Sequence, residues 1–321
     1  MKNFILFYFI LLFCVLICLD LSAQKIDCEF EDFYTFRHKN GKNIFLKEWA
    51  ESKSFFFFEA GMTIDADGSP RAYHPDDSKA LDDLKHAGSE GNWWALVTDN
   101  GEKNGNPIIQ TEKDPAKGYY VSMTSLNNPN YPITSPLRYA DAEKIPYFVL
   151  NPLVMEQTGA KVGDFGYVYN EKTGKGSFAI FGDVGNNQKL GEGSIYLAKK
   201  LGIESDARIG GQHGKILYII FPFSGNGRWR SLEEIETETK KRMDKAFAFS
   251  FLEQCWKKRP KNLDNKKEKN TLIPENSRDS EQIPEENQVE INHQNIEIEQ
   301  NTENNEVEIS PENKEIEKVE D

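Results

Sequence analysis

The sequence has few of the residues that mark several common protein classes. Its 321 residues include only 4 cysteines and 23 glycines, too few for a disulfide-rich scaffold or a collagen-like repeat. Beyond the first twenty residues it has no apolar run long enough to span a bilayer. These absences indicate a globular protein, and the length is sufficient for one large domain or two small ones.

Basic residues are in the minority, with 39 Lys and Arg against 52 Asp and Glu, and the net charge is −13. The excess acid is concentrated at one end of the chain. Residues 260–321 contain 18 acidic and 7 basic residues, a net charge of −11, which leaves −2 for residues 1–259. Because the rest of the chain is nearly neutral and has no basic patch with interleaved aromatics, we expect no nucleic acid partner.

The motifs of several enzyme classes are also missing. There is no G-x-S-x-G elbow and no Walker loop. The 5 histidines are scattered, so we expect no zinc site, and we predict neither another metal nor a cofactor. The segment Asp65-Ala66-Asp67-Gly68 begins like a calcium loop, but its glycine comes two positions early and no glutamate closes the loop, so we interpret it as a turn.

Residues 1–23 are typical of a secretory signal peptide. Lys2 precedes an uncharged run from Phe4 to Leu19, and Ala23 ends a segment suited to cleavage. An uncleaved N-terminal anchor is the alternative. We therefore expect a secreted protein, extracellular or periplasmic, that has no membrane contact after cleavage and is a monomer.

Cleavage would remove Cys14 and Cys18 and leave Cys28 and Cys255, one near each end of the folded region. An oxidising compartment would permit a disulfide between these two residues. The other possibility is a pair of free buried thiols, and the sequence leaves both open.

Residues 260–321 contain no aromatic residue. Such a segment cannot bury enough apolar surface to offset the entropy lost on ordering, so we predict an acidic disordered tail, either cation-attracting or a simple spacer. Just before it, Ser231 and Glu234 fit a capping box, and the amphipathic pattern that follows predicts a C-terminal helix at about 231–257.

The core of the domain, at about 43–225, consists of short apolar runs broken by turn residues. Many are β-branched or aromatic, which predicts a mainly β protein with a few helices and a sandwich or barrel-like core. The expected strands are Ser54–Phe58, Trp94–Thr98, Tyr119–Thr124, Tyr147–Leu150, Gly166–Tyr169, Phe178–Phe181 and Ile216–Phe221. Two helices are expected among them, at 78–87 and at 194–201, the second ended by Gly202.

Two carboxylates stand beside glycines at the ends of expected elements. Asp183 directly follows the strand Phe178–Phe181, and Glu192 lies at the start of the helix at 194–201. A short glycine-rich loop between them could present both acids to one cleft, which is what glycoside hydrolysis requires. The alternative is structural: Asp183 would bind turn amides and Glu192 would favour the positive end of a helix dipole.

Neighbouring aromatic residues occur at two expected strands, as Trp93-Trp94 and Tyr119-Tyr120. Because successive side chains of a strand point to opposite faces, one ring of each pair would point outward. Outward rings beside Asp99 or Asp67 would form a sugar-stacking platform, whereas packing in the core is the alternative for at least half of them.

Seven separate motifs follow one another between about Phe55 and Pro222. They are Met62-Thr63-Ile64-Asp65-Ala66-Asp67-Gly68-Ser69-Pro70, Ala72-Tyr73-His74-Pro75, Gly91-Asn92-Trp93-Trp94-Ala95-Leu96, Gly118-Tyr119-Tyr120-Val121-Ser122, Ile145-Pro146-Tyr147, Phe178-Ala179-Ile180-Phe181-Gly182-Asp183-Val184-Gly185 and Gly191-Glu192-Gly193-Ser194. In residues and in order they closely resemble the chitosanases of glycoside hydrolase family 75, and the resemblance excludes the C-terminal helix and the acidic tail.

The resemblance implies an endo-acting hydrolase of β-1,4-linked glucosamine polymers that inverts the anomeric carbon and needs no cofactor. Residues 24–259 would form the catalytic domain, with a core resembling a double-psi β-barrel. The family's essential aspartate and glutamate match Asp183 and Glu192, and we assign Glu192 as general acid and Asp183 as general base.

Chitosan, the expected substrate, is partly cationic near neutral pH, so carboxylates would bind its ammonium groups by charge-assisted hydrogen bonds. It also lacks the acetamido carbonyl that could act as an internal nucleophile, so both reacting carboxylates must come from the protein. The predicted substrate-binding residues are Asp65, Asp67, Tyr73, His74, Trp93, Trp94, Asp99, Tyr120 and Asp164.

Two other functions remain open at this stage. One is a catalytically inactive carbohydrate-binding module that keeps the barrel and its aromatics. The other is a hydrolase or lytic transglycosylase acting on another cell-wall polysaccharide. Binding of chitosan without release of reducing ends would indicate the first, and degradation of cell-wall material with chitosan left intact would indicate the second.

Overall fold

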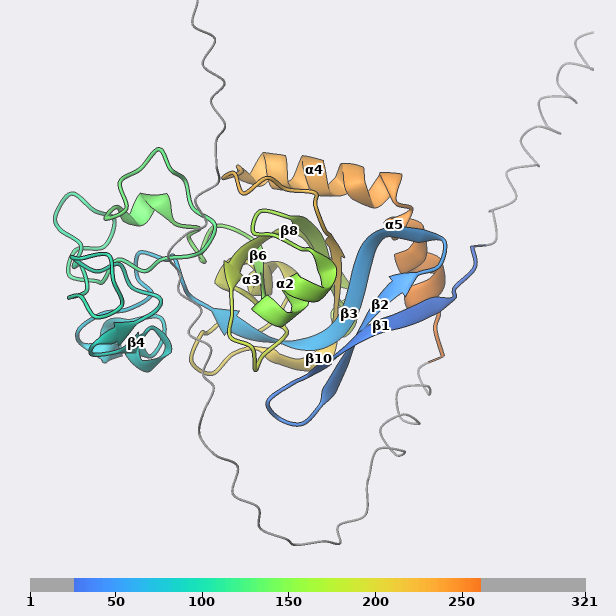
Figure 1. Cartoon of the computed structure of the whole chain (residues 1–321), viewed down its shortest axis with the longest axis horizontal. Coiled ribbons are helices and arrows are strands. Elements are labelled where there is room, and N and C mark those ends of the chain that lie inside the picture. The colour runs from blue at the N-terminus through green and yellow to red at the C-terminus, as the bar shows by residue number, and fades with distance from the viewer. Residues whose placement is uncertain (1–25, 261–321) are drawn as a thin grey trace, which may run out of the picture. The chain divides into compact units, whose positions relative to one another are not determined.

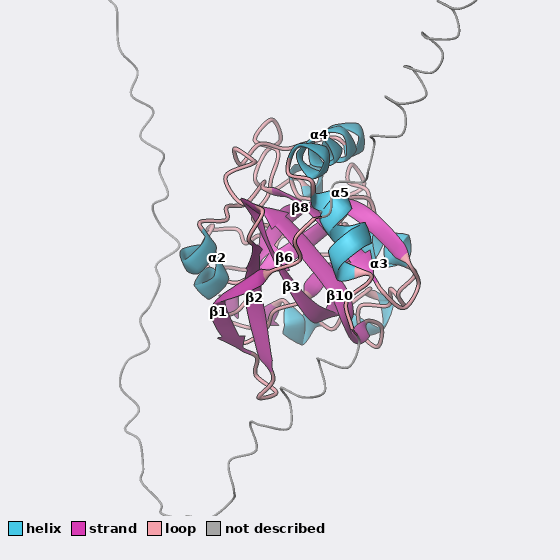
Figure 2. Cartoon of the chain, turned by 90° about the vertical axis from the view of Figure 1, so that its right-hand side faces the viewer, coloured by secondary structure: helices cyan, strands magenta, loops and turns pink. Residues whose placement is uncertain are grey.

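The computed structural model describes residues 26–260, and this part of the chain is mainly β (Figures 1 and 2). The strands are β1 (Phe30–Arg37), β2 (Asn43–Trp49), β3 (Ser52–Asp65), β4 (Gly88–Ser89), β5 (Asn92–Trp93), β6 (Tyr147–Leu150), β7 (Phe165–Asn170), β8 (Lys175–Val184), β9 (Glu192–Ser194) and β10 (Gln212–Phe221). The helices are α2 (Pro152–Thr158), α3 (Ile195–Leu201), α4 (Leu232–Lys245) and α5 (Ala248–Ser250), followed by the π-helical η4 (Phe251–Trp256). Three short 3-10 helices are η1 (Asp77–Lys79), η2 (Leu84–His86) and η3 (Pro136–Arg138).

Six strands close a β-barrel. From β3 the order runs through β10, β7, β8, β6 and β9, and β9 pairs back with β3. The β3–β9 and β6–β8 pairs are parallel, and the other neighbours in the barrel are antiparallel. The β1–β2 hairpin continues the sheet from β3. The prediction of a mainly β fold with a barrel-like core is confirmed, while its double-psi form stays a prediction from the resemblance.

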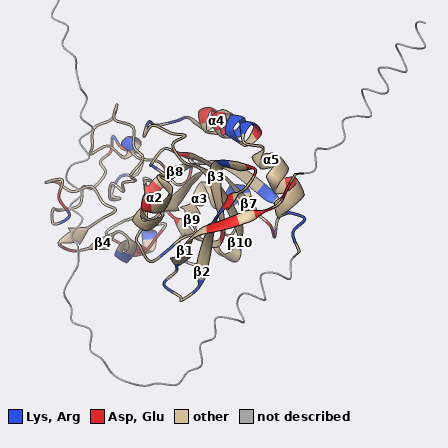
Figure 3. Cartoon of the chain, turned by 45° about the vertical axis from the view of Figure 1, so that its right-hand side comes forward, with Lys and Arg blue, Asp and Glu red and all other residues tan. Residues whose placement is uncertain are grey.

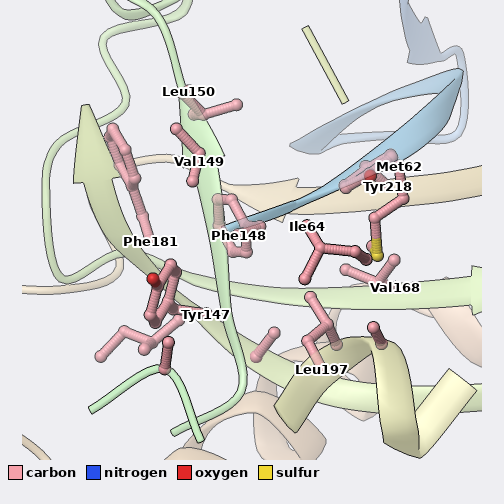
Figure 4. Packing of buried hydrophobic residues seen from close by; sticks show 14 of the residues in the cluster. Met62, Ile64, Tyr147, Phe148, Val149, Leu150, Val168, Phe181, Leu197 and Tyr218 are labelled. Atoms are coloured by element: carbon pink, nitrogen blue, oxygen red, sulfur yellow. The ribbon is translucent and has the colours of Figure 1, made fainter. Parts of the chain in front are cut away.

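The barrel strand β3 is buried on both faces, which explains its unbroken run of phenylalanines. Phe56 and Phe58 belong to the main core, whereas Phe55 and Phe57 belong to a second cluster beneath the C-terminal helices. Figure 4 shows the main core, in which side chains from β3, β6, β8 and α3 meet. A strand covered on both sides is apolar throughout instead of alternating.

The C-terminal helix begins as predicted and ends early. The Ser231 side chain accepts from the Glu234 backbone N–H, and the Glu234 side chain accepts from the Ser231 backbone N–H, so the capping box is present. Helix α4 contacts β7 and β8, and it has Glu233 and Glu234 in its first turn and Arg242 and Lys245 in its last, as the helix dipole favours (Figures 1 and 3). The prediction of one continuous helix to residue 257 is wrong, because Phe247 adopts a left-handed conformation (φ 55°) and the chain turns there into α5 and η4.

Cys28 and Cys255 form a disulfide with a Cα–Cα distance of 5.3 Å, so the bridged alternative is the one found. It joins the segment before β1 to η4. Beside it, the Trp49 indole N–H donates to the carbonyl of Asp27 at 2.7 Å. Both ends of the domain are therefore fixed to each other next to the second core cluster.

Residues 66–146 form a long segment of turns, isolated bridges and short 3-10 helices, whose strands are the two-residue β4 and β5. Five of the seven expected strands are present, but Trp94–Thr98 and Tyr119–Thr124 make only single bridges, such as Leu96 with Ser122. The buried side chain of Gln110 supplies hydrogen bonds between loops in this region. It donates to the carbonyls of Pro70 and Tyr120 and accepts from a backbone N–H, so it connects three loop segments.

The helix predicted at 78–87 is also wrong, since this stretch contains only the 3-10 turns η1 and η2. The Arg208 guanidinium explains the difference: it donates to the carbonyls of Asp77, Ala80 and Asp82, which a helix would have used internally. The helix at 194–201 is confirmed as α3, and Gly202 ends it in the left-handed conformation.

The predicted signal peptide at 1–23, including Cys14 and Cys18, and residues 261–321 of the predicted tail lie outside the described residues. Within residues 26–260 no helix has both the length and the apolar character needed to cross a membrane.

Candidate active site

A β-bulge at the end of β8 positions Asp183. Phe181 pairs with Phe148 of β6, and Asp183 pairs with the next residue, Val149, so Gly182 is left without a partner. Such an extra residue bends its strand and changes the direction of the following side chain, and bulges are frequent beside active sites. The bulge therefore sets the orientation of Asp183.

Glu192 opens β9, on the other side of the same residue of β6. It pairs with Val149, as Asp183 does, and with Thr63 of β3. Paired residues on neighbouring strands point to the same face, so both carboxylates project from one face of the barrel wall. Since neighbouring strands lie about 4.8 Å apart, the two Cα atoms are separated by roughly 9 Å. The Glu192 carboxylate lies beside Gly185, 3.6 Å from where a side-chain Cβ on that glycine would stand.

The Asp183 carboxylate is held through one of its two oxygens. Its Oδ1 accepts from the Ser125 backbone N–H at 2.8 Å, the Ser125 hydroxyl at 2.6 Å and the Val184 backbone N–H at 2.8 Å. No group within residues 26–260 donates to its Oδ2. Burial raises the pKa of Asp183, and the hydrogen bonds from Ser125 oppose that rise.

The Glu192 carboxylate is partly buried, and the described part of the chain gives it neither a hydrogen bond nor an ion pair. Burial raises its pKa, and the negative charge of Asp183 raises it further, while Lys189 acts in the opposite direction. A carboxyl group with no donor and a raised pKa favours the protonated form. The two carboxylates therefore differ in their donors: Asp183 accepts three hydrogen bonds, and Glu192 accepts none from residues 26–260.

Two further aspartates lie beside this pair. Asp65 ends β3 and accepts from the Asp67 backbone N–H at 2.8 Å, and Asp67 accepts from the Tyr73 hydroxyl at 2.7 Å. One oxygen each of Asp65, Asp67 and Asp183 lie within 4.8 Å of one another, a spacing that could hold a cation. Burial and the neighbouring carboxylates raise the pKa of both Asp65 and Asp67 well above the usual range, so this cluster retains protons unless a cation neutralises it.

Replacing Asp65 by Asn is expected to stabilise the protein at neutral pH and to have little effect near pH 4. The folded state holds the Asp65 proton more tightly than the unfolded chain does, so stability is lost as pH rises from the unfolded pKa, about 4, through the raised folded pKa. Asn keeps the acceptor for the Asp67 backbone N–H. We expect Tm to rise by roughly 2–4 °C at pH 7, equivalent to about 1 kcal/mol. Equal gains in Tm at pH 4 and pH 7, or no gain at either pH, would contradict this account. Glu90→Gln, which changes an exposed carboxylate, serves as the control.

Of the predicted aromatic contacts, Trp94 has an exposed ring. Its side chain is 49% exposed, and its indole N–H donates to the carbonyl of His86 at 2.9 Å. Trp93 is partly buried against the main core, as is Tyr120. Trp94 is therefore the member of its pair that points outward.

Tyr73 is buried and reaches the site through the hydrogen bond of its hydroxyl to Asp67. His74 lies in an exposed turn, where its Nδ1 accepts from the Asp76 backbone N–H at 2.8 Å and its ring packs edge-on against Tyr119. The contacts of His74 are thus those of a turn residue.

Two predicted substrate contacts have structural roles instead. Asp164 is fully buried, and its carboxylate accepts from the backbone N–H groups of Lys161, Phe223 and Gly225, so its prediction as a substrate-binding residue is wrong. Asp99 binds the backbone N–H and side chain of Asn106 within its own exposed loop. The structure gives Asp99 no contact with the carboxylate cluster.

The sequence reasoning missed Ser125 and the pair formed by Asp82 and His86. Asp82 is 5% exposed and bonds the His86 Nδ1 at 2.8 Å, and its charge acts on both Asp67 and Glu192. No sequence signal marks these residues. Asp82 and His86 lie in the stretch predicted as a helix, and Ser125 lies 58 residues from Asp183 in the sequence.

Comparisons with known proteins do not relate this arrangement of carboxylates to a family. No protein-family model matches the chain, and no curated protein matches it.

Proposed function

We propose that the protein is a secreted endo-chitosanase that hydrolyses β-1,4 bonds between glucosamine units with inversion. The observation that carries the proposal is the placement of Asp183 and Glu192 on either side of Val149, projecting from one face. Inverting glycosidases keep their two carboxyl groups roughly 6.5–9.5 Å apart to leave room for a water molecule. The Cα atoms of Asp183 and Glu192 lie two strand spacings apart, roughly 9 Å, and the two side chains leave the barrel wall on the same face, an arrangement that supports this class of mechanism.

In this mechanism Glu192 protonates the glycosidic oxygen as the bond to the leaving sugar breaks. Asp183 removes a proton from the water that attacks the anomeric carbon from the opposite side. No group among residues 26–260 donates to the Glu192 carboxylate, which supports its role as the acid. The Oδ2 of Asp183 also accepts from no group in that range, which supports its role as the base, because such an oxygen can accept the proton of water.

The cationic character of the substrate suits the buried aspartates. Asp65 and Asp67 lie within 4.8 Å of Asp183 and are costly to ionise together. A glucosamine ammonium group would supply the missing positive charge and form charge-assisted hydrogen bonds. An acetylated sugar, which has no such charge, would leave the cluster uncompensated, so the cluster favours deacetylated polymers.

The disulfide between Cys28 and Cys255 supports the secreted part of the proposal, since stable disulfides are typical of oxidising compartments. The signal-like residues 1–23 point in the same direction. We propose an extracellular or periplasmic monomer that acts on chitosan.

Trp94→Ala is expected to raise KM for chitosan oligomers roughly five- to tenfold and to change kcat less than twofold. The exposed indole would stack on a sugar outside the reacting pair, a contact worth about 1 kcal/mol in both ground and transition state. Steady-state kinetics on a defined oligomer measure this. Tyr131→Ala, which removes another exposed ring, is the control, and an unchanged KM in Trp94→Ala would remove Trp94 from the substrate path.

The test of the proposed function is the release of reducing ends from highly deacetylated chitosan by the purified protein. We expect activity on this polymer and much less on fully acetylated chitin. Binding of chitosan without release of reducing ends would identify a carbohydrate-binding module instead. Degradation of peptidoglycan with chitosan left intact would identify a different cell-wall hydrolase or a lytic transglycosylase.

A further inference from the structure

Ser125 makes the densest set of contacts with the carboxylate cluster, although it lies in a loop with no regular structure. Its hydroxyl and its backbone N–H both donate to Oδ1 of Asp183, at 2.6 and 2.8 Å. The same hydroxyl accepts from the Val184 backbone N–H at 3.2 Å. This N–H is shared, because it also donates to Oδ1 of Asp183, its nearer acceptor, at 2.8 Å, so Ser125, Val184 and Asp183 form one hydrogen-bonded group.

The loop around Ser125 is fixed on both sides. The backbone N–H of Leu126 donates to the carbonyl of Gly182, the bulge residue, at 2.9 Å. On the other side, the Thr124 hydroxyl donates to the carbonyl of Leu126 and accepts from the backbone N–H of Ala140. Gly182 itself has no room for a side chain, since a Cβ there would stand 2.5 Å from Tyr147. Ser125 is thus locked to the bulge that orients Asp183.

The three aspartates of the cluster differ in their donors. Asp65 receives the Asp67 backbone N–H and lies within hydrogen-bonding reach of the Tyr147 hydroxyl, and Asp67 receives the Tyr73 hydroxyl and a longer contact of 3.3 Å from Ser122. Asp183 receives three donors within 2.8 Å, all on one oxygen. Hydrogen bonds to a carboxylate favour its ionised form, so the donors select Asp183 to hold the negative charge.

We infer that Ser125 is a positioning residue that keeps Asp183 ionised and, by holding Oδ1, turns Oδ2 toward the reacting water. This inference rests on the proposed function for the identity of the reaction, but the ionisation of Asp183 can be measured without it. Ser125 selects which of three neighbouring carboxylates acts as the base. The direction of the pKa effects agrees, since the hydrogen bonds of Ser125 are the leading influence that lowers the pKa of Asp183 against burial.

The experiment compares Ser125→Ala, Ser125→Val and Ser125→Thr in the full chain. Valine and threonine have nearly the same shape, so they differ in the hydroxyl alone, and they keep the test valid if the alanine variant does not fold. The pKa of Asp183 is read by carbon NMR of its carboxyl group, assigned with Asp183→Asn. Chitosan hydrolysis is followed against pH in the same variants. Ser135→Ala removes a hydroxyl that caps η3 in the same long segment and is the control.

We expect the Ala and Val variants to raise the NMR-measured pKa of Asp183 by about one unit. The acidic limb of the profile of kcat/KM against pH should move to higher pH by the same amount. At pH values below that limb, kcat/KM should be roughly tenfold lower than in the wild type. The Thr variant should restore both, and Ser135→Ala should change neither. An unmoved Asp183 titration in both Ala and Val variants would overturn the inference, as would loss of activity without any shift of the pH profile.

If the wild-type protein were inert on chitosan, the proposed function would fail and the NMR titration would still decide the role of Ser125. If the wild type were active and the titration unmoved, the inference alone would fail. The two failures are therefore distinguishable.

Discussion

Glu192→Gln and Asp183→Asn are each expected to lower kcat on chitosan by about a thousandfold, equivalent to about 4 kcal/mol in the activation barrier. Each change removes a proton donor or acceptor and keeps the shape of the side chain. The Glu192 side chain has no hydrogen-bond partner within residues 26–260, so a glutamine amide at this position breaks no hydrogen bond, and Asn at 183 keeps an oxygen for the donors of Ser125. Melting temperatures of both variants should stay at or above that of the wild type.

The two variants should differ on a substrate with a good leaving group, such as a glucosamine oligomer bearing a dinitrophenyl aglycone. Such a leaving group needs no proton, so Glu192→Gln should recover most of its rate, whereas Asp183→Asn should not. Glu90→Gln is the matched control for loss of an exposed carboxylate. Near-normal chitosan hydrolysis in either site variant would refute its assigned role, and the opposite pattern on the activated substrate would exchange the two roles.

Removal of the disulfide by Cys28→Ser with Cys255→Ser is expected to cost about 2–4 kcal/mol of folding free energy. The bridge closes a loop with a sequence separation of 227, and its loss would free the chain before β1 from η4. In a domain of this size the change corresponds to a fall in Tm of roughly 5–15 °C. Thermal unfolding of the double variant measures this fall in Tm. Thermal unfolding of the wild type with and without reductant measures the same effect independently.

The disulfide prediction has a direct chemical control. Mass spectrometry of the non-reduced protein should find the peptides of Cys28 and Cys255 joined. A Tm that does not change under reduction, in a protein shown to carry the bridge, would contradict the stabilising role.

Much of the barrel could be predicted because its signals are local. Apolar runs bounded by turn residues mark β6, β7, β8 and β10, and Gly202 marks the end of α3. The capping box at Ser231 likewise depends only on residues three positions apart. Local rules determine such features, so the sequence is enough to find them.

The remaining features depend on contacts between distant residues. The helix expected at 78–87 fails because Arg208, more than 120 residues away, takes its carbonyls. The end of α4 coincides with the left-handed conformation of Phe247, which the propensity of phenylalanine does not favour. Strand order around the barrel also has no local signal.

The candidate site likewise has features that the sequence predicts and features that depend on contacts between distant residues. Asp183 and Glu192 could be proposed from adjacent glycines, but their placement on either side of Val149 needs the strand order β8–β6–β9. Asp164 was misassigned because a buried aspartate that binds backbone amides looks, in sequence, like one that binds a ligand. Ser125 was missed because its loop reaches Asp183 only in the folded chain.

The most direct test of the central claim is the configuration of the first product. Proton NMR of the anomeric signals, recorded in the first minutes of chitosan oligomer hydrolysis by the wild-type protein, distinguishes the two anomers before they equilibrate. A carboxylate pair that acts as acid and base across one bond predicts the α-anomer as the initial product. Initial formation of the β-anomer would contradict the arrangement of Asp183 and Glu192 as base and acid, and a complete absence of product would contradict the proposed activity itself.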